Sequence, residues 1–257
     1  MDETKIECEW SYTPRDYFEE KIVLNRDNYI VEIMDGHIVA RMNANFFDSV
    51  PGLRNSLTQE LNDYFRGALP IRRRPFEILV GSIHRIWPDG RRDTTLEVQS
   101  ANMTMLVESP DLILRDAAGK VIHDSRRNRI EATKAVAELS SRYAPTYPTV
   151  RRILDSFDAA VRYPGSVFVY LYEVWEALQT VFRGEKKARK MLEISRKKCR
   201  RLKRLANREP LNQGRHRGKF AGKLRDATTN ELDESWEITC DMYEKYLRYL
   251  NKRDEPK

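Results

Sequence analysis

Residues 29–41 read YIVEIMDGHIVAR, and this stretch predicts the fold of the first half of the chain. Two β-branched runs flank Asp35-Gly36, and a glycine accepts the positive φ that a tight hairpin turn demands. The stretch therefore predicts two antiparallel strands joined by a short turn. Further strands are expected at 21–24, 76–80, 82–87, 94–98, 103–108, 112–114 and 120–123.

One helix interrupts these strands. Leu53, Leu57, Leu61 and Phe65 recur at a spacing of four residues, which is typical of an amphipathic helix. The helix is expected over 51–66, with Gly67 ending it. Strands around a helix predict an α+β domain over about 15–125.

From Asn128 onward the apolar residues follow a helical period. Ser195 is a candidate N-cap, and Thr228-x-x-Glu231 has the capping-box pattern of a helix start. Helices are expected at 129–143, 150–163, 166–182, 185–192 and 196–207, with a last one after Thr228. The predicted fold class is α+β: a β-rich α+β domain over 1–127, followed by an all-α helical bundle over 128–257.

Composition excludes several classes of protein. No run of eighteen apolar residues occurs, so no membrane partner is expected. The isolated thiols Cys8, Cys199 and Cys240 indicate a reducing compartment, and we expect a cytoplasmic protein. No P-loop, dinucleotide fingerprint or nucleophile elbow is present, and the histidines lack zinc-site spacing. Neither a cofactor nor a metal is predicted.

The charge is concentrated in one segment. Residues 183–225 hold eighteen Lys or Arg against three acids, a net charge of +15. The whole chain carries +7, so the remaining residues sum to −8. Such a density of positive charge indicates a polyanion or an acidic surface as partner. The predicted nucleic-acid-binding residues are Lys197, Lys198, Arg200, Arg201, Lys203, Arg204, Arg208 and Lys219.

The loop at 214–219, GRHRGK, carries the candidate chemistry. His216 can act as a general acid or base near neutral pH, and Arg215 and Arg217 could clamp a phosphate. These three residues are the predicted catalytic group of a metal-independent ribonuclease. A histidine packed within a basic anchoring loop is the alternative.

Several short motifs carry a family resemblance: 171–173 (LYE), 182–187 (FRGEKK), 202–207 (LKRLAN) and Arg215-His216. With the closing helix, they resemble the HEPN superfamily of bacterial helical domains, in particular the C-terminal domains of uncharacterised, phage-defence-associated proteins. The resemblance covers about 166–250, a third of the chain. It implies a helical bundle that forms a homodimer through this domain.

The resemblance also bears on activity. Active HEPN domains are metal-independent ribonucleases that use an arginine a few residues before a histidine, and inactive members bind RNA or proteins. His216 matches the histidine, but positions 209–211, where the arginine would stand, read Glu-Pro-Leu.

Three hypotheses remain open at this point. The first is a bacterial protein that binds RNA, with or without cleavage, in phage defence or a toxin–antitoxin system. The second is a non-catalytic interaction protein that docks an acidic protein partner on its basic face. The third is a sequence-independent DNA binder, although no helix-turn-helix pattern supports it.

Overall fold

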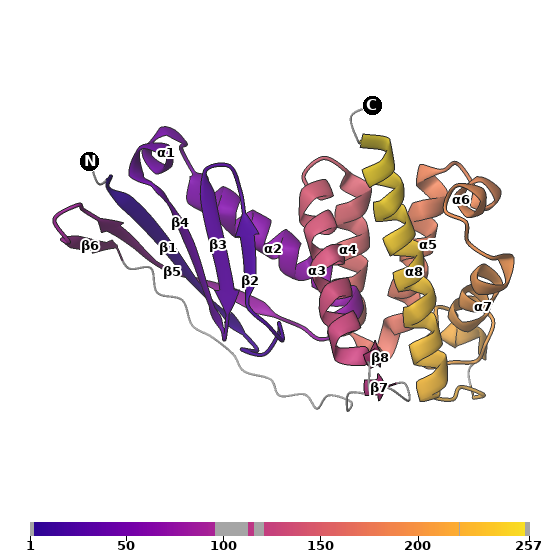
Figure 1. Ribbon diagram of the computed structural model, residues 1–257. Helices are drawn as coiled ribbons and strands as arrows, with labels where there is room; N and C mark the ends of the chain where they lie inside the picture. The colour runs from indigo at the N-terminus through magenta and orange to yellow at the C-terminus, as the bar shows by residue number, and fades with distance from the viewer. Residues whose placement is uncertain (1–2, 96–112, 116–120, 221, 255–257) are drawn as a thin grey trace. The chain divides into compact units, whose positions relative to one another are not determined.

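The computed structural model describes residues 3–95, 113–115, 121–220 and 222–254 (Figure 1). The fold is mixed α+β, with the strands in the N-terminal part and most helices in the C-terminal part, which confirms the predicted class. The chain divides into two compact units. The first comprises Met1–Asn62 and Phe76–Lys134, and the second comprises Asp63–Pro75 and Ala135–Lys257.

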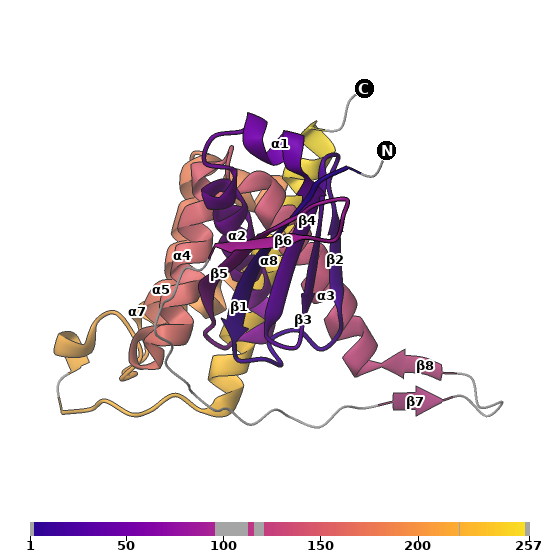
Figure 2. The ribbon, with the colours of Figure 1, turned by 90° about the vertical axis from the view of Figure 1, so that its left-hand side faces the viewer.

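The first unit contains a six-stranded antiparallel sheet of order β2-β3-β4-β1-β5-β6. β7 and β8 form a separate two-stranded sheet (Figure 2). The strands are β1 (Lys5–Thr13), β2 (Ile22–Asn25), β3 (Tyr29–Met34), β4 (His37–Asn43), β5 (Glu77–Ile86), β6 (Arg92–Thr95), β7 (Ile113–Arg115) and β8 (Val121–Asp124).

The hairpin of β3 and β4 forms as the sequence predicts. Met34 pairs with His37 across the turn, and both turn residues take positive φ, 50° at Asp35 and 84° at Gly36. The strand predicted at 103–108 lies outside the described residues. The one predicted at 94–98 corresponds to β6, which begins earlier, at Arg92, and residues 96–98 lie outside the described residues.

β1 is a strand that the sequence reading missed, although it pairs with both β4 and β5. Its side chains alternate in burial, with Ile6, Cys8, Trp10 and Tyr12 turned to the core. β5, in turn, is one continuous strand where two were expected. The register slips at Gly81, where an added Cβ would lie 2.9 Å from the Glu9 carbonyl oxygen. The glycine therefore marks a bulge with a close backbone approach, not a break between strands.

The two faces of the sheet differ in chemistry. On the buried face, Trp10 Nε1 donates to Thr58 Oγ1 at 2.9 Å, which ties β1 to the first half of α2. On the other face, charges alternate across neighbouring strands. Arg41 binds Glu32 at 2.5 Å and Glu7 at 2.8 Å. This face is exposed to solvent, as expected for an antiparallel sheet covered on one side, and also carries the exposed apolar side chains Val23, Ile30 and Met34.

α2 corrects the prediction that Gly67 ends a helix. It runs without interruption from Leu53 to Arg72. A Cβ on Gly67 would lie 2.6 Å from Ser140 Cβ and 2.7 Å from Ala137 Cα. The glycine is thus required by close packing of α2 against α3, not by a helix terminus.

Eight α-helices lie in the described ranges. They are α1 (Ala44–Ser49), α2 (Leu53–Arg72), α3 (Ser125–Tyr143), α4 (Pro148–Arg162), α5 (Val167–Val181), α6 (Glu185–Met191), α7 (Arg196–Asn207) and α8 (Thr229–Asp254). Two short 3-10 turns cover Pro164–Ser166 and Arg217–Phe220.

α5 is the central helix of the second unit. It packs against α4, α6, α7 and α8, so it buries more than one face, including Phe168, Leu171, Trp175 and Leu178. α8 begins with the predicted capping box. Glu231 N donates to Thr228 Oγ1 at 3.2 Å, and Thr228 N donates to Glu231 Oε2 at 3.0 Å. Two otherwise unpaired backbone donors are thereby satisfied.

Candidate nucleic-acid interface

α7 spans Arg196–Asn207, as predicted, and Ser195 caps it by accepting a hydrogen bond from Lys198 N at 3.2 Å. The buried stripe of Cys199, Leu202, Leu205 and Ala206 faces the bundle, where α7 contacts α5 and α8. Because this stripe is narrow, the basic side chains are left to project outward. They border two separate hollows, one on each side of the helix.

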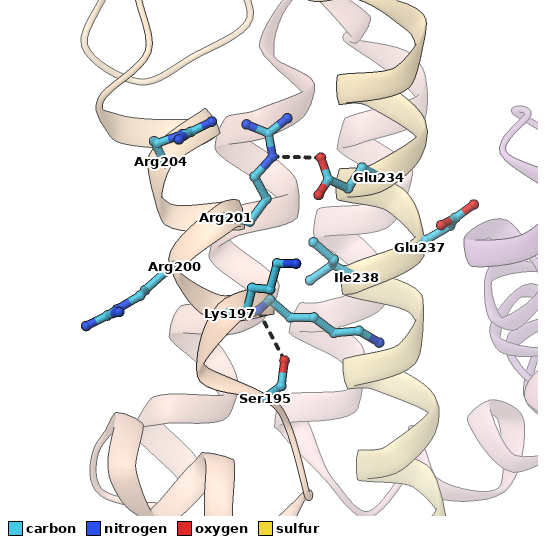
Figure 3. A pocket seen from close by; sticks show the side chains of 9 residues that line it. Ser195, Lys197, Arg200, Arg201, Arg204, Glu234, Glu237 and Ile238 are labelled. Atoms are coloured by element: carbon cyan, nitrogen blue, oxygen red, sulfur yellow. Dashed lines mark hydrogen bonds and ion pairs between the residues drawn. The ribbon is translucent and has the colours of Figure 1, made fainter.

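The first hollow is a groove of about 850 Å³ between α7 and α8 (Figure 3). Acids of α8 neutralise part of it. Arg201 binds Glu234 at 2.6 Å, and Lys198 binds Asp241 at 2.7 Å. Figure 3 shows Arg201 turned toward Glu234, while Arg200 points away from the groove. The α7–α8 groove is therefore only partly neutralised, with five cations against two acids in its lining. Its lining is Ser195, Lys197, Lys198, Arg200, Arg201, Arg204, Glu234, Glu237 and Ile238.

The second hollow, of about 540 Å³, lies on the α6 side of α7 and is strongly cationic. Glu185 is the one acid among the described residues that line it, and it already pairs with Arg189 at 3.9 Å. Arg204 pairs with Glu209 at 2.9 Å. The other cations have no ion pair within the described part of the chain. These four residues, here called the cationic stripe, are Arg196, Arg200, Lys203 and Arg208.

Three members of the cationic stripe, Arg196, Arg200 and Lys203, lie on one face of α7, at spacings of four and three residues. Arg208 follows at the C-cap of the helix. From Arg196 to Arg208 the stripe spans about 18 Å at 1.5 Å per residue. All four side chains are exposed. The stripe can therefore contact several phosphates of one strand.

In the loop after α7, both arginines predicted to hold a phosphate are bound to other parts of the helical unit. Arg215 binds Glu176 of α5 at 2.8 Å, and its guanidinium lies 5.5 Å from the Tyr172 ring centroid. Arg217 donates to Gly165 O at 2.9 Å and to Ser166 Oγ at 2.5 Å. Both arginines thus hold the loop against α5 and the turn before it.

His216 stands between these two arginines with an exposed side chain. Among the described residues, no side-chain hydrogen bond to His216 is formed. The loop around it is nevertheless firmly placed. Arg215 N donates to Ala206 O at 2.8 Å, and Gly214 passes so close that an added Cβ would lie 3.3 Å from the same carbonyl oxygen. Lys219 lies over the Phe220 ring at 5.9 Å.

The structure thus divides the predicted nucleic-acid-binding residues. Lys197, Lys198 and Arg201 line the α7–α8 groove, and Lys203 and Arg208 line the hollow on the α6 side. Arg200 and Arg204 border both, and Lys219 lies in the loop. Arg196 also belongs to the stripe, and its position four residues before Arg200 is the signal that would have found it.

No known protein family, no curated protein and no solved structure matches this chain. Within the described ranges, every helix is too short or too polar to span a bilayer. The same ranges contain no cluster of three His, Cys, Asp or Glu side chains suited to a metal ion. Function is therefore inferred from the chemistry of the interface itself.

Proposed function

We propose that the protein binds RNA, with the cationic stripe of α7 contacting the phosphate backbone. The observation that carries this proposal is the hollow beside α6, where four exposed cations lack an ion pair within the described residues. Unpaired cations along one helix face repel one another, and a polyanion relieves that repulsion. Phosphate contacts require many Lys or Arg on one surface but no fixed geometry, which a single helix face satisfies.

Binding without cleavage is the form of the proposal that the loop geometry favours. A ribonuclease of the predicted type needs an arginine free to hold the phosphate beside its histidine. Arg215 and Arg217 instead bind Glu176 and the turn at Gly165 and Ser166. We accordingly propose a non-catalytic, HEPN-like role for the helical unit, supported by the order of its helices. Its place in phage defence or a toxin–antitoxin pair belongs to the same proposal.

An acidic protein partner is the second candidate, and the α7–α8 groove supports it. Lys198 and Arg201 already bind carboxylates of α8 there. The same side chains could exchange these partners for carboxylates of another chain. Poly-L-glutamate separates the two candidates. If the site prefers phosphates, poly-L-glutamate should displace bound RNA poorly. If the natural partner is an acidic protein, poly-L-glutamate should displace the RNA when the two polyanions are present at equal charge concentration.

The direct test is the salt dependence of RNA binding. Labelled single-stranded RNA should bind with log K falling linearly against log salt, by about 0.7 per phosphate contact. Arg200→Gln/Arg208→Gln removes two members of the stripe and should flatten that slope by about 1.4. Arg151→Gln/Arg152→Gln removes two exposed arginines of α4 and is the charge-matched control.

The two variants decide the outcome together. Loss of affinity confined to Arg200→Gln/Arg208→Gln would support the stripe as the contact surface. A salt-independent affinity, or equal losses in both variants, would overturn the proposal. In the latter case the effect would come from net charge alone.

A further inference from the structure

Tyr163, which is exposed, and Tyr170, which is half-buried, form an aromatic pair in the helical unit. Tyr163 is 60% exposed, whereas the large aromatic residues Phe157, Phe168 and Trp175 of the neighbouring helices are fully buried. The Tyr163 and Tyr170 ring centroids lie 6.2 Å apart, with the planes inclined by 42°. The burial of apolar surface does not account for a ring held in this position, because most of Tyr163 remains in water.

A tight turn holds Tyr163 in place. Its carbonyl oxygen accepts a hydrogen bond from Ser166 N at 2.9 Å, and Val167 N donates to Pro164 O. Tyr170 lies four residues after Ser166, about one turn along α5. The two rings are thus attached to a fixed turn and to the helix that follows it, so little backbone entropy remains to be lost on binding.

The same turn is tied to the basic loop. Arg217 donates to Gly165 O at 2.9 Å and to Ser166 Oγ at 2.5 Å, two to three residues from Tyr163. Arg215, two residues earlier, is bonded through its backbone N to Ala206 O in the last turn of α7. Two residues of chain span at most about 7 Å. The end of α7 and the turn of Tyr163 are therefore connected by residues 215–217 and the side chain of Arg217.

We propose that Tyr163, with Tyr170 beside it, stacks the bases of single-stranded RNA whose phosphates lie on the cationic stripe. This inference rests on the proposed RNA binding and specifies its ligand. Aromatic rings beside a basic groove are the typical platform for single strands, since each base offers a π face to the ring. In a duplex those faces are stacked on one another and cannot reach a tyrosine. The expected ligand is single-stranded and read with little sequence preference.

The test compares three ligands of about 12 nucleotides, within the site sizes of such grooves. They are a single-stranded RNA, the same strand in a duplex, and an abasic strand that keeps only the sugar-phosphate backbone. The single strand should bind more tightly than the abasic strand. Tyr163→Leu keeps the apolar bulk but removes the aromatic face, and should weaken single-strand binding by roughly fivefold to a hundredfold. Affinity for the abasic strand should not change.

Tyr163→Phe is the matched control, since it keeps the ring and removes only the hydroxyl, and it should bind like the wild type. Equal binding of single-stranded and abasic ligands by the wild-type protein would overturn the stacking inference and leave phosphate binding intact. Equal affinity of Tyr163→Leu and the wild type for the single strand would also overturn it. Absence of binding to all three ligands would instead overturn the proposed function itself.

Discussion

Arg225 and Glu231 form a bidentate ion pair, with Arg225 Nη1 2.8 Å from Glu231 Oε2 and Nη2 2.8 Å from Oε1. Glu231 also accepts from Thr228 N in the capping box of α8. Backbone bonds from Asn212 N to Arg225 O and from Arg225 N to Pro210 O close the loop that carries His216. One carboxylate therefore joins the end of that loop to the start of α8.

This ion pair predicts a specific dependence of stability on pH. The hydrogen bond from Arg225 lowers the pKa of Glu231 from 4.5 to about 2, although burial acts in the opposite direction. A carboxyl whose pKa is lowered by folding stabilises the protein above its unfolded pKa. That contribution is therefore lost as pH falls from about 4.5 to about 2.

Glu231→Gln should lower the free energy of unfolding by about 1–3 kcal/mol near pH 7, because it removes a charged hydrogen-bond acceptor. The difference from the wild type should shrink toward pH 2, where the wild-type carboxyl becomes protonated. Urea unfolding of the wild type and Glu231→Gln near pH 7 and near pH 2 measures this difference in the free energy of unfolding. Glu237→Gln, exposed on the same helix, should have little effect. A constant difference at both pH values would contradict the assignment.

Gly67 gives a second prediction, on packing. Alanine favours a helix over glycine by about 1 kcal/mol, but its Cβ would collide with Ser140 and Ala137. The displacement would also disturb the 2.8 Å hydrogen bond between Ser140 Oγ and Tyr243 Oη. Gly67→Ala should therefore destabilise the protein by about 1–3 kcal/mol, as overpacking does. Gly218→Ala, with no atom within 4 Å of the added Cβ, should be neutral in the same thermal unfolding experiment.

The three thiols should be unreactive in the folded protein. Burial raises the pKa of Cys8 to about 11, of Cys199 to about 11 and of Cys240 to about 12. Because the thiolate is the reactive form, a disulfide reagent at about pH 8 should modify none of them rapidly. In guanidinium all three should react. A fast-reacting thiol in the native protein would show that one of these sites opens.

The loop geometry predicts that RNA remains intact. Purified wild-type protein and His216→Ala should give the same absence of product from labelled RNA in EDTA. Both flanking arginines are bound elsewhere in the protein, so the phosphate at His216 lacks its clamp. Cleavage by the wild type that disappears in His216→Ala would restore the ribonuclease hypothesis, and equal cleavage by both would indicate a contaminant.

The sequence predicted those elements whose information is local. The bounds of α7 and the capping box at Thr228 follow from residues within a few positions of each other. β1 was missed although Ile6, Cys8, Trp10 and Tyr12 alternate with polar residues, which is the local pattern of a half-buried strand. Its place between β4 and β5 depends on pairing with distant segments. Gly67 was interpreted as a helix end for the same reason, since its neighbour Ser140 is remote in the chain.

The sequence also predicted only the local part of the interface. The composition of α7 identifies a basic helix, but it does not show which cations are already paired. Glu234 and Asp241 belong to α8, which follows α7 after a loop, and they pair with Arg201 and Lys198 on one side of α7. The interval 183–219 contains no Phe, Trp or Tyr, so the basic segment itself predicts no stacking platform. The turn that carries Tyr163 is joined to the basic loop by the hydrogen bond from Arg217 to Gly165 O.

The assignment of residues 63–75 to the helical unit limits how the protein can be dissected. Gly67 packs beside Ser140, and Cys240 Sγ donates to the Pro70 carbonyl oxygen at 3.0 Å. A fragment that starts at residue 128 would lack this segment and would leave those surfaces bare. Because the unit is assembled from two separate stretches, no single cleavage of the polypeptide can release it whole. Truncation studies should therefore retain the full chain, or graft 63–75 back onto the fragment.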